Sequence, residues 1–195
     1  MNLPNRLTVM RLLLVPVIMV FILFQVIGQP WSNIVAAALF LAASLTDMLD
    51  GKLARKYDLI TDFGKFLDPL ADKFLVIGAM LSLCSITGGI YQRLLIIATI
   101  IVVFRELAVT SLRLLVSGAS GVVIAANILG KIKTTTQIVF VMSALLEPVV
   151  WSIIWEDLIE YNIITYTAMA VMTVMTVWSG INYIKSYWKY LDPKK

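Results

Sequence analysis

Residues 47–72 read DMLDGKLARKYDLITDFGKFLDPLAD, a polar stretch in a chain that is otherwise largely apolar. The stretch holds half of the 12 acidic residues in the chain, namely Asp47, Asp50, Asp58, Asp62, Asp68 and Asp72. On both sides the sequence returns to long runs of Leu, Ile, Val, Ala and Phe. An acidic stretch with such flanks indicates a polar site between membrane-embedded segments.

The composition is that of an integral membrane protein. Of the 195 residues, 60% are hydrophobic and 14% are charged, with a mean hydropathy of +0.91, whereas soluble domains are about 45–50% apolar and about 25% charged. No Pro/Gly/Ser-rich linker divides the chain, so we expect one membrane domain over residues 1–195. Cys84 is the single cysteine, which rules out an internal disulfide. Histidine is absent, so acid–base or metal chemistry must use carboxylates.

Six apolar segments each approach the roughly 20 residues that a helix needs to cross a membrane. They cover approximately 8–28, 32–55, 66–86, 91–116, 131–155 and 160–185. The first follows a basic start but no small-residue cleavage site comes after it, so we expect a retained helix rather than a signal peptide. The expected fold is all-α, a polytopic bundle of six transmembrane helices.

The basic residues predict the orientation of this bundle. Six spans place both termini on one side, and of the 16 Lys and Arg residues only Arg93 falls on the other side. The positive-inside bias therefore predicts a multi-pass protein of the cell membrane with both termini in the cytoplasm. The aspartates of 47–72 would then lie near the cytoplasmic ends of the second and third spans.

Four of the aspartates form two pairs at helical spacing. Asp47 and Asp50 are three residues apart and Asp68 and Asp72 are four apart, so each pair shares one helical face. Asp47 lies about 12 Å deeper than Arg55 along a helix, where a charge is costly. If the two helices pack as antiparallel neighbours, the carboxylates converge and either become protonated or bind cations. Hard oxygen ligands favour Mg²⁺, Mn²⁺ or Ca²⁺, and two such ions suit a displacement at phosphorus.

Other residues of the stretch are expected to have different roles. Gly51 leaves room for a ligand close to the backbone, and Arg55 could meet a phosphate or a nucleotide. Asp58 and Asp62 fall outside the periodic faces, so we expect them in the connection between the two helices.

The stretch resembles the signature of the CDP-alcohol phosphatidyltransferase family. The pattern here is Asp47-x-x-Asp50-Gly51-x-x-Ala54-Arg55, eight residues, then Gly64-x-x-x-Asp68-x-x-x-Asp72, and every fixed position is matched. The resemblance implies a dimeric six-helix membrane enzyme with two divalent cations, Mg²⁺ or Mn²⁺, at a site facing the cytoplasm. It implies a CDP-linked donor from which CMP leaves.

The resemblance also implies roles for individual residues. The metal ligands would be Asp47, Asp50, Asp68 and Asp72, with Asp72 also acting as the general base. The CDP pocket would be formed by Asp47, Gly51, Ala54 and Arg55.

A phosphorylated acceptor would need basic residues near the aspartates. The candidates are Arg105, Arg113, Lys131 and Lys133. Arg105 and Arg113 are two helical turns apart and share a face, and the lysines lie where a helix starts, with free N–H groups. The alternatives are that these residues only anchor the helix ends, or that Arg105 pairs with Glu106.

Two further stretches resemble the glycerol-3-phosphate branch of the family. They are LPNRLTVMRLLLVP at 3–16, with Asn5, Thr8, Arg11 and Pro16, and NILGKIKTTTQ at 127–137. This branch implies transfer of a phosphatidyl group from CDP-diacylglycerol to glycerol 3-phosphate, giving phosphatidylglycerophosphate and CMP in phospholipid biosynthesis.

Three other functions are open on the sequence alone. A sister enzyme could use serine or an inositol phosphate as acceptor. A small cation transporter would spread its acids across the membrane depth, and it would leave Gly51, Ala54, Arg55 and Gly64 unexplained. A membrane scaffold would not explain the register of the aspartates. The sequence contains no basic stripe with exposed aromatics, so it does not indicate nucleic-acid binding.

Overall fold

A computed structural model describes residues 2–56, 61–120, 128–154 and 162–188; within these ranges the side chains of residues 3, 4, 48–56, 62, 65 and 117–120 are not described. The described chain consists of helices, which confirms the all-α expectation. The helices are α1 (Leu3–Phe24), α2 (Trp31–Lys56), α3 (Asp62–Ile86), α4 (Gly89–Ser120), α5 (Ile128–Ile154) and α6 (Ile163–Tyr187).

The helix ends differ from the expected ones where local backbone signals act. The first helix was expected to reach residue 28, but it ends at Phe24, because Gln25 takes a left-handed conformation with φ 48°. Gly89 has φ 61° at the turn before α4, a conformation that glycine adopts without strain. Asp62, which was expected in the connection, is the first residue of α3.

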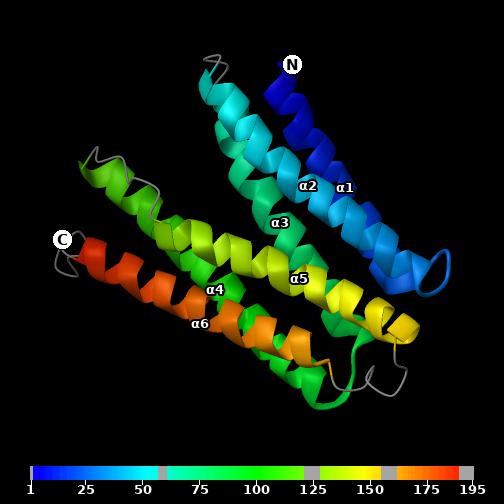
Figure 1. Cartoon of the computed structure of the whole chain (residues 1–195). Helices are drawn as coiled ribbons and strands as arrows, with labels where there is room; N and C mark the ends of the chain where they lie inside the picture. The colour runs from blue at the N-terminus through cyan, green and yellow to red at the C-terminus, as the bar shows by residue number, and fades with distance from the viewer. Residues whose placement is uncertain (1, 57–60, 121–127, 155–161, 189–195) are drawn as a thin grey trace.

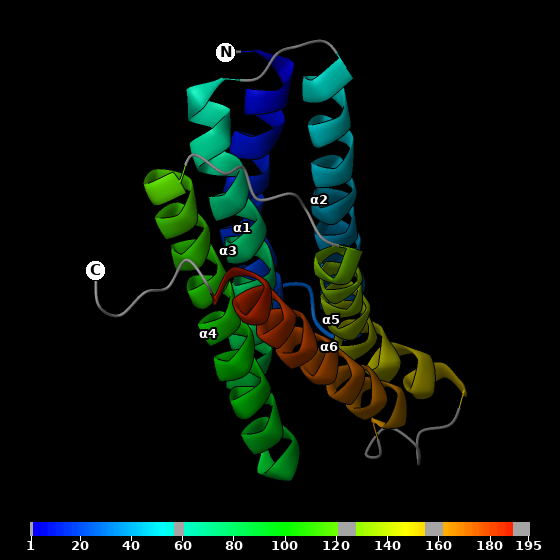
Figure 2. The same cartoon turned by 90° about the vertical axis from the view of Figure 1, so that its left-hand side faces the viewer.

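The helices pack as two groups of three. In the first group α1 packs against both α2 and α3, and in the second group α6 packs against both α4 and α5. The groups meet where α2 packs against α5 and α3 packs against α4 (Figures 1 and 2). Figure 1 shows the two groups diverging toward the end at which α1 begins and α6 ends. That end also carries the described residues of the 47–72 stretch.

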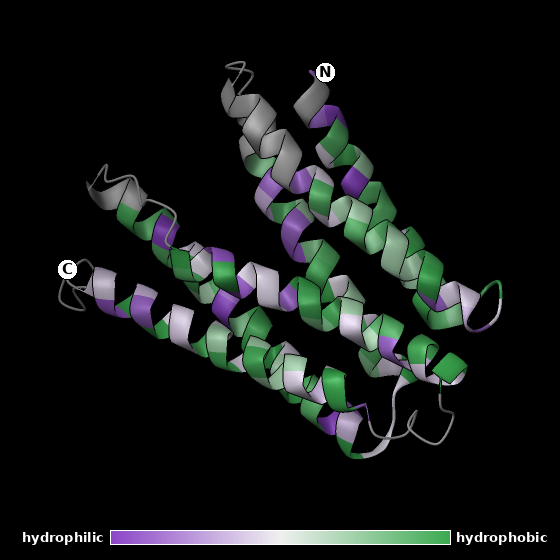
Figure 3. Cartoon of the chain, viewed as in Figure 1, coloured by the Kyte–Doolittle hydropathy of each residue, from purple (hydrophilic) through white to green (hydrophobic). Residues whose placement is uncertain are grey.

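Apolar side chains fill the core and also cover much of the outer surface. Ile18, Phe40 and Leu145 are among the fully buried residues, while Phe104 is 71% exposed and Ile153 is 76% exposed. Hydrophobic residues line most of the length of the helices (Figure 3). An apolar surface of this extent would be unstable in water, but it suits a lipid environment, where helices satisfy their own backbone hydrogen bonds.

Five of the helices, within the described ranges, are long and apolar enough to cross a membrane, as expected of a multi-pass membrane protein. These five are α1, α3, α4, α5 and α6. α2 has 26 residues; its described apolar segment is Trp31–Asp47, and the side chains of residues 48–56 lie outside the described ones.

Candidate active site

A polar face of α1 contacts the signature aspartates. Asn5, Thr8 and Arg11 are spaced by three residues, so they lie along one side of this helix, and all three are buried. Thr8 Oγ1 donates a hydrogen bond to Asp68 Oδ1 at 2.7 Å. Arg11 Nη1 donates to Asp47 Oδ1 at 2.7 Å and to Asp72 Oδ1 at 2.8 Å. Three of the four predicted metal ligands therefore contact α1.

Arg11 joins two helices that otherwise contact each other over a short stretch. α2 and α3 each pack mainly against α1, so direct packing of α2 on α3, the condition considered for convergence of the carboxylates, accounts for only a small part of the arrangement. Arg11 is fully buried, while the side chains of Asp47 and Asp72 are 38% and 46% exposed. The two carboxylates thus have a buried side facing Arg11 and a side open to the surroundings.

Gly64 allows α1 and α3 to approach closely just above this group. Thr61 caps the start of α3, where its Oγ1 accepts a hydrogen bond from Gly64 N at 3.0 Å. Asn5 and Thr61 exchange two side-chain hydrogen bonds of 2.9 and 3.0 Å. A Cβ atom on residue 64 would lie 2.9 Å from Asn5 Oδ1, too close for the present packing. This contact gives a physical reason for glycine at that signature position.

The donor set suits a divalent cation. Asp47 and Asp72 both bring a carboxylate oxygen to within 2.8 Å of one cationic nitrogen, so the two helices can share a single positive charge. Carboxylate oxygens without histidine or thiolate are the ligands that Mg²⁺ and Mn²⁺ accept. Among the described residues, no group of three or more His, Cys, Asp or Glu is already arranged to hold a metal ion. Asp50, the fourth predicted ligand, does not belong to the described side chains.

The predicted CDP pocket lies largely outside the described side chains. Gly51, Ala54 and Arg55 belong to α2 by their backbone, but nothing beyond that is described for them. Asp58 falls in the range 57–60, outside the described residues. Asp47 is the one member of this predicted pocket with a described side chain.

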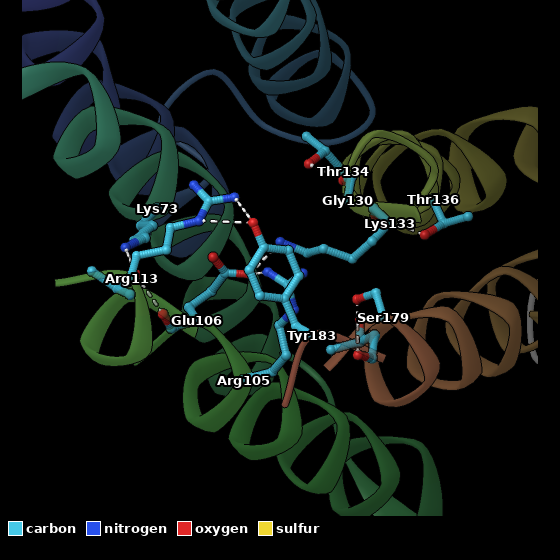
Figure 4. Close-up of polar contacts among 12 residues, drawn as sticks. Lys73, Arg105, Glu106, Arg113, Gly130, Lys133, Thr134, Thr136, Ser179 and Tyr183 are labelled. Atoms are coloured by element: carbon cyan, nitrogen blue, oxygen red, sulfur yellow. Dashed lines mark hydrogen bonds and ion pairs between the residues drawn. The ribbon is translucent and has the colours of Figure 1, made fainter. Parts of the chain in front are cut away.

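A second polar cluster lies between α3, α4, α5 and α6 (Figure 4). Glu106 Oε1 accepts hydrogen bonds from Lys133 Nζ and from Arg105 Nη1, the latter at 3.2 Å. The side chains of Arg105, Glu106 and Lys133 are 11%, 12% and 7% exposed. The alternative pairing of Arg105 with Glu106 is therefore present, and it includes Lys133 from α5.

Further residues complete this basic cluster, which we define as Lys73, Arg105, Glu106, Arg113 and Lys133. Lys73 Nζ donates a hydrogen bond to Thr110 Oγ1, one turn beyond Glu106. Arg113 donates from Nε and Nη2 to the hydroxyl of Tyr183, at 3.1 and 2.6 Å. With four cations and one carboxylate, the basic cluster carries excess positive charge and can accept an anionic ligand.

The four predicted acceptor residues are placed unequally. Arg105 and Lys133 meet at Glu106, and Arg113 lies nearby against Tyr183 (Figure 4). Lys131, only two residues from Lys133, is exposed on another face of α5. The structure thus brings three of these residues into one region.

The carboxylates and the basic cluster are adjacent because they share α3. Asp72 and Lys73 are consecutive: Asp72 contacts Arg11 of α1, while Lys73 contacts Thr110 of α4. An acidic group and a basic group thus lie on two sides of one helix turn. This arrangement can hold a metal-bound phosphate ester beside a second phosphorylated molecule.

The sequence did not assign site roles to Arg11, Thr8, Lys73 or Tyr183. Thr8 and Arg11 had a usable signal, since polar residues at spacing of three stand out in an otherwise apolar helix. Tyr183 had none, because it is 70 residues from Arg113 in sequence.

Known proteins resemble this chain over nearly its whole length. A model of the CDP-alcohol phosphatidyltransferase family matches residues 1–178. A CDP-diacylglycerol–glycerol-3-phosphate 3-phosphatidyltransferase of Bacillus subtilis (strain 168) is 38% identical over 199 residues, covering 97% of each chain. A protein of the same name from Rickettsia bellii (strain RML369-C) is 35% identical, again over 97% of each chain. Another, from Escherichia coli (strain K12), is 33% identical over 95% of this chain and 94% of its own.

Proposed function

Because the chain belongs to the CDP-alcohol phosphatidyltransferase family, we propose that it transfers the phosphatidyl group of CDP-diacylglycerol to glycerol 3-phosphate. The products are phosphatidylglycerophosphate and CMP, in phospholipid biosynthesis. The observation that carries the proposal is the near full-length similarity to several enzymes of that one name. The adjacent carboxylates and basic cluster supply the matching chemistry.

The donor side of the site consists of the signature residues. Asp47, Asp50, Asp68 and Asp72 would hold two Mg²⁺ or Mn²⁺ ions, which when bound neutralise the pyrophosphate and stabilise charge on the transferring group. Thr8 and Arg11 contact carboxylates of this group from the side of α1. The cytidine part of the donor would lie against Gly51, Ala54 and Arg55.

The acceptor side consists of the basic cluster. Lys133, Arg105 and Arg113 would bind the phosphate of glycerol 3-phosphate, with excess positive charge as the support for this role. Lys131, which is exposed, would contribute at the entrance. The neighbouring turn of α3 would then place the primary hydroxyl of the acceptor next to Asp72.

The reaction is a single displacement at phosphorus. The acceptor hydroxyl oxygen attacks the lipid-side β-phosphorus, and the bond from that phosphorus to the oxygen of CMP breaks. Asp72 takes the proton of the attacking hydroxyl, a role supported by the lack of histidine and by its partial exposure. CMP leaves with the α-phosphate, and no covalent enzyme intermediate forms.

The proposed setting is the cell membrane with α2 as the sixth span. Both termini and the active site would face the cytoplasm, supported by the distribution of basic residues. The acyl chains of the donor would lie in the inner leaflet, and the enzyme would act as a homodimer, as the family resemblance implies.

A CMP-release assay on the purified protein tests this function. CDP-diacylglycerol is incubated with glycerol 3-phosphate, serine or an inositol phosphate, each with Mg²⁺, Mn²⁺ or EDTA. We expect CMP only with glycerol 3-phosphate and only when a metal is present. CMP release with serine or an inositol phosphate, but not with glycerol 3-phosphate, would refute glycerol 3-phosphate as the acceptor. CMP release in EDTA would refute the metal requirement.

A further inference from the structure

Arg11 is a fully buried charge that contacts carboxylates on two different helices. One nitrogen, Nη1, donates to Asp47 of α2 and to Asp72 of α3. Burial leaves the guanidinium 0% exposed, so water screens this interaction weakly from the inner side. The two carboxylates would repel each other without a cation between them. Arg11 therefore supplies positive charge where the helices of the site meet.

The same two carboxylates are among the proposed metal ligands. A divalent cation approaching from their exposed side would meet oxygens that already interact with Arg11, at 2.7 and 2.8 Å. The cation and the guanidinium would also repel each other across a short, poorly screened distance. Arg11 and the metal thus perform the same electrostatic task and oppose each other's binding to the carboxylates.

We propose that Arg11 is a positioning residue: an internal counter-charge that keeps α2 and α3 together on α1 when no metal is bound, and that weakens the binding of the metal. The inference rests on the proposed function insofar as the aspartates bind a divalent cation. It adds a role for α1, a helix that carries none of the aspartates, in setting how tightly they bind the cation. Metal could then enter and leave without disassembly of the site.

The test compares Arg11→Gln with Arg11→Lys and with Arg6→Gln in the full-length protein in detergent. Arg6 is exposed on the same helix, so its replacement controls for loss of one positive charge from α1. The Tm is measured in EDTA and at saturating Mn²⁺, and Mn²⁺ affinity is measured from the electron paramagnetic resonance of the free ion. Neither readout depends on phosphatidyl transfer. The two must agree, because a ligand stabilises the folded state according to its affinity.

We expect Arg11→Gln to lower the Tm by several degrees in EDTA, and Mn²⁺ to remove at least half of that difference. Mn²⁺ should bind Arg11→Gln at least ten-fold more tightly than wild type. In both Tm and Mn²⁺ affinity, Arg11→Lys should fall between Arg11→Gln and wild type, and Arg6→Gln should match wild type. An equal loss of Tm with and without Mn²⁺ would mean that Arg11 only packs the helices, and weaker Mn²⁺ binding would mean that it preorganises the ligands; either result overturns the proposal.

Two further outcomes also give a decision. If Arg11→Gln does not fold in EDTA, the double variant Arg11→Gln/Asp47→Asn removes one of the repelling charges. Recovery of a folded protein would support the counter-charge, and no recovery would contradict it. If wild type binds no Mn²⁺, the metal dependence of the proposed function fails. The Tm values in EDTA then decide whether Arg11 acts through its charge. A higher Tm for Arg11→Lys than for Arg11→Gln would show that it does, and equal Tm values would show that it does not.

Discussion

Asp72 is the residue at which the two halves of the site meet. Its carboxylate contacts Arg11, and the next residue, Lys73, contacts Thr110 of α4, the helix that also carries Arg105, Glu106 and Arg113. Asp72→Asn keeps the size of the side chain and its ability to accept a hydrogen bond, but it removes the charge and the basicity. We expect kcat for CMP release to fall by about 100-fold or more, as for loss of a general base.

The matched control for this change is Asp62→Asn. Asp62 belongs to the same acidic stretch but lies at the first position of α3, six residues before Asp68. The control should retain near-normal turnover, and both variants should keep the Tm of wild type within a few degrees. If Asp72→Asn turned over at the wild-type rate, the base would have to be another group.

Lys133 and Lys131 offer a comparison within one turn of α5. Lys133 is 7% exposed and contacts Glu106, whereas Lys131 is exposed. Lys133→Gln should raise KM for glycerol 3-phosphate about ten-fold, the loss expected for one charge-assisted hydrogen bond. Lys131→Gln should raise it less, and KM for CDP-diacylglycerol should change little in either variant. Equal effects of the two variants, or a parallel rise in both KM values, would count against the basic cluster as the acceptor site.

At the scale of elements, α1 contacts both α2 and α3 through close packing as well as charge. Gly64→Ala would place a Cβ atom 2.9 Å from Asn5 Oδ1, which is buried and hydrogen-bonded to Thr61. Relieving this contact requires α1 and α3 to separate or the Asn5–Thr61 hydrogen bonds to break. We expect a loss of about 1–3 kcal/mol in the free energy of unfolding, measured as a lower Tm in detergent.

Gly130→Ala provides the control for helix propensity. A Cβ at residue 130 meets nothing within 4 Å, and the residue lies inside α5. Alanine there should leave the stability unchanged or raise it by up to about 1 kcal/mol. Adding Asn5→Ala to Gly64→Ala should recover part of the loss, because the atom in the way is removed. If Gly64→Ala were as neutral as Gly130→Ala, close approach would not explain this glycine.

The helices themselves could be predicted, but their partners could not. Long apolar runs and turn signals located six helices to within a few residues, because those signals are local in the chain. The spacing of Asp47 and Asp72 identified a helical face without showing what that face contacts. From the sequence alone, the faces that carry Asp47 and Asp72 could have packed against each other. In the structure, Arg11 of α1 lies between the two carboxylates. Pairing of helices depends on side-chain fit over long sequence separations, which one sequence does not display.

For the whole molecule, the membrane topology depends on α2. Its described apolar segment is Trp31–Asp47, which ends where the described side chains of α2 end. The complete helix has 26 residues, or about 39 Å at 1.5 Å per residue, enough to span the hydrocarbon core. Its charged end would lie among the cytoplasmic headgroups, where Lys and Arg side chains are stable. A spanning α2 and the positive-inside bias together fix a testable topology.

Arg6 and Arg93 test this topology because they lie near the starts of α1 and α4, at opposite predicted faces of the membrane, and both are exposed. After Cys84→Ala removes the one native thiol, Arg6→Cys and Arg93→Cys are exposed separately to a membrane-impermeant maleimide on intact cells. We expect labelling of Arg93→Cys on intact cells, and of Arg6→Cys only after lysis. Three spans separate these positions if α2 crosses, and two if it does not. Labelling of both variants from the same side would therefore exclude a spanning α2, and a reversed pattern would place the active site outside the cytoplasm.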